Sequence, residues 1–220
     1  MNAPRRLVLL RHGRTAWNAE RRAQGHSDVP LDELGQTQAA STGPVVAAMR
    51  PAAVWASDLS RALETGRAVA EAAGLEVVVD QRLRERSLGV LEGLTYDELA
   101  AQRPDDLKAW EAGGMSWSAM PGAETDDVLA ERYCAAVADL VETLGPGQLG
   151  VVAAHGACTK VGAAALAGLG EAFSREVGVL ANGGWVELAE RVDAPAAAGQ
   201  GARWRLTAYN RSVASIAELL

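Results

Sequence analysis

Four short, almost entirely apolar runs constrain the fold of this 220-residue chain more than any other feature. Runs without alternation of polar and apolar residues are typical of strands buried on both faces of a parallel sheet. Helical patterns, with apolar residues at steps of three and four, lie between the runs. This alternation predicts an α/β fold with a mainly parallel central sheet. The runs are residues 7–10, 54–56, 75–79 and 149–154, and the helical patterns are residues 33–49, 60–73 and 126–144.

Two further segments extend the strand pattern toward the end of the chain. Residues 185–188 and 204–209 alternate between apolar and polar side chains, as final strands or an antiparallel edge would. Residues 195–201 between them are small and predict a loop.

The middle of the chain is less regular. Thr95 and Glu98 match a capping box, which predicts a helix that starts near residue 95. Residues 103–125 follow without a clear period, and irregular segments of this length are often functional. We therefore predict one domain over residues 1–220, with a cap-like insertion at about 88–125 over a pocket.

Charge and cysteine content exclude several classes of protein. The net charge is −7 and no polybasic run is present, which argues against a nucleic-acid partner. Cys134 and Cys158 lack metal-ligand spacing and are predicted to be free thiols in a reducing compartment. The apolar run at 7–10 is too short for a signal peptide or a membrane span. We expect a cytoplasmic protein with no membrane partner.

Chemically useful residues follow four of the predicted strands. His12 follows the first strand and His155 follows residues 149–154, each with a glycine after it. Arg61 opens a predicted helix after the second strand, and Glu85 follows the third. Each residue alone has a plainer explanation as a structural histidine or a surface charge. Together they predict one site, because ligands bind beyond the carboxyl ends of parallel strands.

Two histidines and two arginines at one sheet edge suit a phosphoryl group. The guanidinium groups of Arg11 and Arg61 match phosphoryl oxygens, and their charge favours a neutral His12 that can attack phosphorus. Glu85 is the candidate proton donor to the leaving oxygen and the base for water in the second step. The arginines supply the positive charge, so we expect no metal and no cofactor.

The sequence argues against two other kinds of site, a dinucleotide site and a zinc site. Residues 145–150 read G-x-G-x-x-G, but they precede a strand and contain Pro146, which argues against a dinucleotide site. A zinc site at His12 and His155 is disfavoured, because Arg11 would repel a dication and no short-spaced ligand pair is present.

The same residues, with several others, resemble the histidine phosphatase superfamily, which includes cofactor-dependent phosphoglycerate mutase. The resemblance covers nearly the whole chain and implies a three-layer α/β/α sandwich. It is carried by residues 10–18 (LRHGRTAWN), 24–31 (QGHSDVPL), 57–65 (SDLSRALET), 84–85 (RE), 89–93 (GVLEG), 121–125 (PGAET) and 155–156 (HG).

By this resemblance His12 carries the phosphoryl group and Glu85 is the proton donor and acceptor. Arg11, Arg61 and His155 are phosphate-pocket residues. The substrate-binding residues that we predict are Asn18, Gln24, Gly25, Arg11, Arg61 and Gly156. The implied function is hydrolysis of a small phosphorylated metabolite.

Two alternatives stay open within the family. One is a phosphoglycerate mutase, whose longer cap carries a paired-arginine segment; residues 103–120 contain no such pair, and Trp110 and Trp117 make the segment more apolar. The other is a non-catalytic member, which the presence of every expected site residue disfavours.

One subgroup is particularly similar in sequence. Residues 203–210 and 183–185 are similar to the actinobacterial glucosyl-3-phosphoglycerate phosphatases, whereas the α-ribazole and broad-specificity phosphatases share the same core. Because members of that subgroup are dimers, the resemblance also implies a homodimer.

Overall fold

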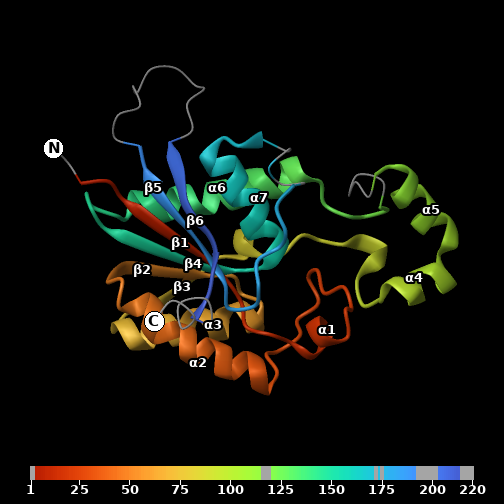
Figure 1. Cartoon of the computed structure of the whole chain (residues 1–220), viewed down its shortest axis with the longest axis horizontal. Coiled ribbons are helices and arrows are strands. Elements are labelled where there is room, and N and C mark those ends of the chain that lie inside the picture. The colour runs from red at the N-terminus through yellow and green to blue at the C-terminus, as the bar shows by residue number, and fades with distance from the viewer. Residues whose placement is uncertain (1–2, 115–119, 171–172, 174–175, 192–202, 214–220) are drawn as a thin grey trace.

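The computed structural model describes residues 3–114, 120–170, 173, 176–191 and 203–213. Strands and helices alternate over most of this chain (Figure 1). The elements are β1 (Arg6–Arg11), α1 (Ala16–Ala19), α2 (Glu33–Ala47), β2 (Pro51–Ala56), α3 (Ser60–Ala73), β3 (Val77–Val79), η1 (Gln81–Leu83), η2 (Gly89–Leu91), α4 (Tyr96–Gln102), α5 (Pro104–Ala112), α6 (Asp126–Glu142), β4 (Leu149–Ala154), α7 (Gly156–Ala167), β5 (Trp185–Glu190) and β6 (Trp204–Arg211).

These strands form one sheet in the order β3-β2-β4-β1-β5-β6. Strands β3, β2, β4 and β1 run parallel to one another. Strand β5 runs antiparallel to β1, and β6 runs antiparallel to β5. The mainly parallel sheet is therefore confirmed, and the two alternating segments form its antiparallel edge. In the ladder between β1 and β4, Arg11 is the partner of Ala154. The residues that follow them, His12 and His155, leave the sheet at the same end.

Helices cover both faces of the sheet, which confirms the three-layer α/β/α sandwich. In Figure 1, α2 and α3 lie below the sheet, and α6 and α7 lie above it. Alternate residues of β1 point into the two layers, with Leu7 and Leu9 in the α6–α7 core and Val8 and Leu10 in the α2–α3 core. Burial on both faces explains why this strand is apolar without alternation.

Most predicted elements are observed, with small shifts at their ends. The residues of α3 and β4 are those predicted, while α2 and α6 each end two residues early. The third strand begins at Val77 instead of residue 75, because Gly74 ends α3 in the left-handed conformation. The Leu75 amide then donates back to the Ala70 carbonyl, so Leu75 belongs to the helix end.

The region around residues 88–125 has its own apolar cluster. Thr95 caps α4 by the predicted capping box. The expectation of irregular structure from residue 103 is wrong for α5, which starts at Pro104, where the missing N–H costs no hydrogen bond. Figure 1 shows α4 and α5 to one side of the sheet. Their cluster consists of Leu91, Leu99, Leu107, Trp110 and Met120.

Two predictions lie outside the described residues, namely the contribution of Trp117 and the loop at 195–201. None of the helices in the described part of the chain combines the length and the apolar character that crossing a bilayer requires.

Gly162 provides a test of the packing between α6 and α7. A Cβ at Gly162 would overlap the ring of Tyr133, which is fully buried. Alanine gains about 1 kcal/mol in helix propensity, but overpacking a buried site costs about 1–3 kcal/mol. We expect Gly162→Ala to lower the free energy of unfolding, measured by urea denaturation. Gly178→Ala is the matched control, because nothing lies within 4 Å of its added methyl group. Equal unfolding free energies for the two variants would contradict this expectation.

Candidate active site

His12 and His155 meet at the carboxyl edge of the sheet. Their ring centroids are 5.2 Å apart with an interplanar angle of 64°. Both side chains are buried, with exposed fractions of 3% for His12 and 0% for His155. The structure therefore brings together two imidazoles that 143 residues separate in the sequence.

The hydrogen bond of His12 determines which of its nitrogens can react. Nδ1 lies 2.6 Å from the carbonyl oxygen of Gly13. Because a carbonyl only accepts, Nδ1 carries the proton and Nε2 keeps its lone pair. Burial first, and then the charges of Arg11 and Arg61, lower the pKa of His12 well below its usual value. His12 is thus a neutral imidazole whose Nε2 keeps a free lone pair.

Arg61 orients the second imidazole. Its Nε donates to Nδ1 of His155 at 3.2 Å, and its other nitrogens donate to the carbonyls of Ser27 and Gly25 at 2.8 and 2.9 Å. Since Nδ1 of His155 accepts, the proton of the neutral ring is on Nε2. Burial, followed by the charge of Arg61, lowers the pKa of His155. Its Nε2 is buried and has no hydrogen-bond partner among the described residues.

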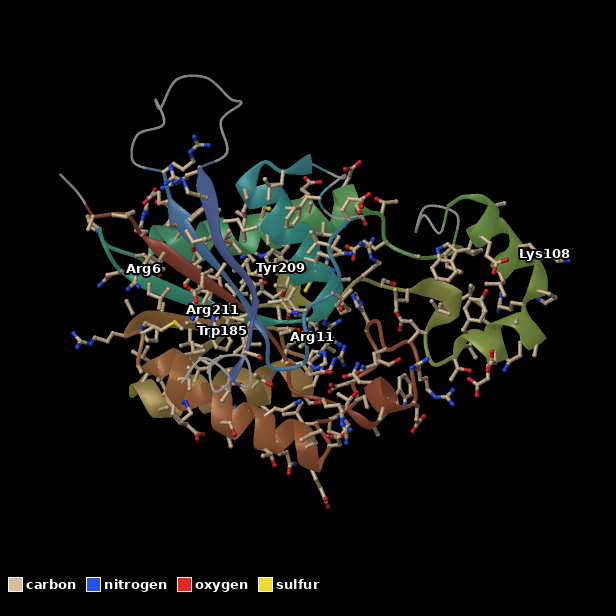
Figure 2. The ribbon with its side chains drawn as sticks, in the orientation of Figure 1. Arg6, Arg11, Lys108, Trp185, Tyr209 and Arg211 are labelled. Atoms are coloured by element: carbon tan, nitrogen blue, oxygen red, sulfur yellow. The ribbon has the colours of Figure 1, made fainter. Side chains whose placement is uncertain are left out.

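Arg11 provides a second buried donor without a partner. Its Nη1 donates to the Leu180 carbonyl, whereas Nε is buried and unpaired among the described residues. Figure 2 shows Arg11 at the end of β1 that faces α4 and α5. A Cβ on Gly156 would lie 3.3 Å from Arg11 Nε and 2.6 Å from a Val179 methyl group. Gly156 therefore leaves room for the guanidinium beside the start of α7.

Glu85 lies at the start of α7. Its two carboxylate oxygens accept from the amides of Ala157 and Cys158 at 3.0 and 2.9 Å. Similarly, Asp28 accepts from the Ser60 amide at the start of α3, at 2.7 Å. Carboxylates of the chain therefore bind amides at the start of both helices.

The remaining predicted residues have different surroundings. The Asn18 Oδ1 accepts from Thr15 and Asn182, which leaves its own N–H groups for a ligand. Gln24 is buried, and its Oε1 lacks a partner among the described residues. Gly25 has a φ of +53°, a conformation that favours glycine, and binds Arg61 through its carbonyl.

Sequence reasoning missed Asn182. Its Nδ2 lies 3.2 Å from the His12 carbonyl, 3.3 Å from the Gly13 carbonyl and 3.1 Å from Asn18 Oδ1. Asn182 thus links the nucleophile, the carbonyl that selects its tautomer and Asn18. No motif or spacing identifies it, because it lies 170 residues from His12 in the loop before β5.

A buried neutral imidazole with a free lone pair, an imidazole N–H, two guanidiniums and a carboxylate are the groups that covalent phosphoryl transfer requires. The described residues contain no group of three or more His, Cys, Asp or Glu that could hold a metal ion. Residues 7–200 match the histidine phosphatase superfamily (branch 1), and the chain belongs to this family.

Several relatives match almost the full length of the chain. A glucosyl-3-phosphoglycerate phosphatase of Mycolicibacterium vanbaalenii is 38% identical over 216 residues, which cover 94% of this chain and 95% of the relative. The structure of a mycobacterial glucosyl-3-phosphoglycerate phosphatase with VO3 has a TM-score of 0.82 at 36% identity, covering 94% of this chain and 100% of that one. Phosphoglycerate mutase-like protein 4 of Arabidopsis thaliana is 38% identical, but the match covers only 68% of this chain and 66% of the relative.

The two buried histidines predict acid sensitivity of the fold. Their pKa values are lowered in the folded protein, so the unfolded chain binds more protons below about pH 6.5. Stability present above that pH is therefore lost as the pH falls, by at most about 1.4 kcal/mol per histidine and pH unit. We expect urea unfolding at about pH 7, 6 and 5 to show this decline. The double variant His12→Gln/His155→Gln should show a shallower decline, and parallel curves would refute the explanation.

Proposed function

We propose that this chain is a metal-independent phosphomonoesterase that hydrolyses a small phosphorylated metabolite through a phosphohistidine at His12. The observation that carries the proposal is the ring of His155 beside that of His12, together with two buried donors, His155 Nε2 and Arg11 Nε, that have no partner among the described residues. Buried N–H groups without acceptors are costly, and the oxygens of a phosphoryl group would satisfy them.

In the first half-reaction, the lone pair on His12 Nε2 attacks phosphorus in line with the leaving oxygen. The N–P bond forms as the ester P–O bond breaks, and Glu85 gives its proton to that oxygen. Arg11, Arg61 and the Nε2–H of His155 stabilise the charge on the phosphoryl oxygens. The Gly13 carbonyl continues to accept from Nδ1–H, which stabilises the positive charge that develops on the ring.

In the second half-reaction, water attacks the phosphohistidine. Glu85, now a carboxylate, takes a proton from this water while the new P–O bond forms and the N–P bond breaks. Inorganic phosphate leaves, and His12 recovers its lone pair. The hydrogen bonds of Glu85 to Ala157 and Cys158 suit its carboxylate form, the form that this step requires.

The substrate that we favour is glucosyl-3-phosphoglycerate or a related phosphorylated metabolite. Support comes from relatives of that name that cover nearly the whole chain, whereas the mutase-like relative covers two thirds of it. Residues 103–120 also lack the arginine pair expected of a mutase. A mutase or a non-catalytic protein is therefore the weaker alternative.

Three further proposals concern the surroundings of the site. Residues 88–125 act as a cap over the pocket, which the separate apolar cluster around α4 and α5 supports. The protein is cytoplasmic, as the net charge of −7 and its free cysteines suggest. Resemblance to dimeric phosphatases supports a homodimer, which sedimentation analysis would test.

Replacing the nucleophile tests the mechanism. We expect His12→Gln to lower turnover of an aryl phosphate by at least about 10³-fold in the presence of a chelator, because the covalent intermediate forms on the imidazole that the variant lacks. Wild-type protein mixed with radiolabelled substrate and quenched should carry an acid-labile, alkali-stable label that the variant lacks. Circular dichroism checks that the variant is folded. Activity within tenfold of wild type would refute the role of His12.

A substrate panel tests the proposed specificity. We expect kcat/KM for glucosyl-3-phosphoglycerate to exceed that for 3-phosphoglycerate, sugar phosphates and nucleotides by at least about tenfold, because specificity appears as a ratio of these constants. The same panel should yield no interconversion of 3- and 2-phosphoglycerate when 2,3-bisphosphoglycerate is added. Equal kcat/KM values would indicate a broad-specificity phosphatase, and interconversion would support the mutase.

A further inference from the structure

We propose that Arg132 and Glu124 form a positioning pair for Glu85, and that this pair determines how efficiently the leaving oxygen is protonated. The inference rests on the proposed role of Glu85 as the proton donor. Among the described residues no hydrogen bond joins either of them to the two histidines, and Arg132 belongs to none of the motifs that the sequence singled out. Arg132 comes from α6, and Glu124 lies two residues before that helix.

Arg132 makes the largest possible set of hydrogen bonds for an arginine. Its Nε and Nη2 donate to the two carboxylate oxygens of Glu124 at 2.6 and 2.7 Å. Its Nη1 donates to the carbonyls of Arg82 and Arg84, both at 2.7 Å, and Nη2 donates to the carbonyl of Glu85 at 2.8 Å. These five bonds match the five N–H groups of a guanidinium, which a lysine cannot reproduce.

Two of the three carbonyl acceptors, those of Arg84 and Glu85, belong to the turn that carries Glu85, and the third, that of Arg82, lies in η1 directly before it. That turn follows η1 and has no sheet partner of its own, so these bonds set the direction of its peptide groups. His26 adds a bond from Nε2 to the same Glu85 carbonyl at 2.8 Å. Proton transfer requires the carboxyl to lie within hydrogen-bond reach of the leaving oxygen, so a shift of this turn would weaken it.

Glu124 also forms hydrogen bonds with the residues that directly follow Glu85. Its backbone carbonyl accepts from Arg86 Nη1 at 2.6 Å, and its amide donates to the Ser87 carbonyl at 2.9 Å. Only 20% of the Arg132 side chain and 11% of the Glu124 side chain are exposed. A bidentate, mostly buried ion pair holds its geometry far better than an exposed one. The pair therefore holds the backbone of the turn that carries Glu85, the proposed acid, in one position.

Leaving-group dependence distinguishes positioning of the acid from general support of the fold. A phenolate leaves readily without a proton, whereas an alkoxide requires one. The constant kcat/KM reports the steps up to departure of the leaving group, so the later attack of water does not contribute. A misplaced Glu85 should therefore lower kcat/KM for an alkyl phosphate much more than for an aryl phosphate. A partly unfolded enzyme would lower both equally.

The experiment compares Arg132→Lys with wild type on p-nitrophenyl phosphate and on glycerol phosphate. We expect a loss in kcat/KM of at least about 30-fold on the alkyl substrate and less than about threefold on the aryl substrate. Glu124→Gln keeps one acceptor for the guanidinium. It should show a smaller loss in kcat/KM that is again selective for the alkyl substrate. If Arg132→Lys does not fold, the two constants of Glu124→Gln test the proposal. Arg5→Lys is the matched control, because its side chain forms a bidentate pair of similar burial with Glu190 at the opposite end of β1 and should leave both constants unchanged.

Glu85→Gln serves as the reference in the same assay. If its loss is selective for the alkyl substrate and that of the Arg132 and Glu124 variants is not, the positioning role is wrong while the proposed function stands. If Glu85→Gln loses activity equally on both substrates, the assignment of the proton donor fails, and this inference fails with it. Selective losses in all three variants support the proposal.

Discussion

Arg11 and Ala154 are partners in the parallel ladder between β1 and β4, and the rest of the site depends on this pairing. Because the two strands end together, His12 and His155 leave the sheet side by side, with 5.2 Å between their ring centroids. A shift of one residue in this register would reverse the faces of every side chain in β1. The apolar residues that β1 buries on both faces therefore stabilise the sheet and position His12 at the same time.

Positive charge is concentrated at this edge of the sheet, and its burial lowers the stability of the protein. Burial lowers the pKa of both Arg11 and Arg61, which reflects the loss of water around their guanidiniums. Glu85 and Asp28 compensate for part of that charge, but they are bound to the first amides of α7 and α3. The unpaired donors of Arg11 and His155 remain preorganised for an anion, an arrangement that favours catalysis over maximum stability.

Different residues hold His12 and Glu85 in position. His12 depends on the Gly13 carbonyl and Asn182, whereas Glu85 depends on Arg132, Glu124 and the turn after η1. Each reacting group is thus held by side chains from a distant part of the chain. Arg132 of helix α6 and Asn182 of the loop before β5 make hydrogen bonds that restrict the motion of the segments carrying Glu85 and His12.

The sequence by itself determined the layers, the parallel sheet and the principal residues at its edge. Apolar runs that alternate with helical periods allow few other arrangements, and His12, Arg61, Glu85 and His155 each follow a strand. Only the tertiary structure decided the tautomers of the histidines, the capping of α7 by Glu85, and the contacts of Asn182 and Arg132. These depend on hydrogen bonds between residues remote in sequence, which no local period or spacing encodes.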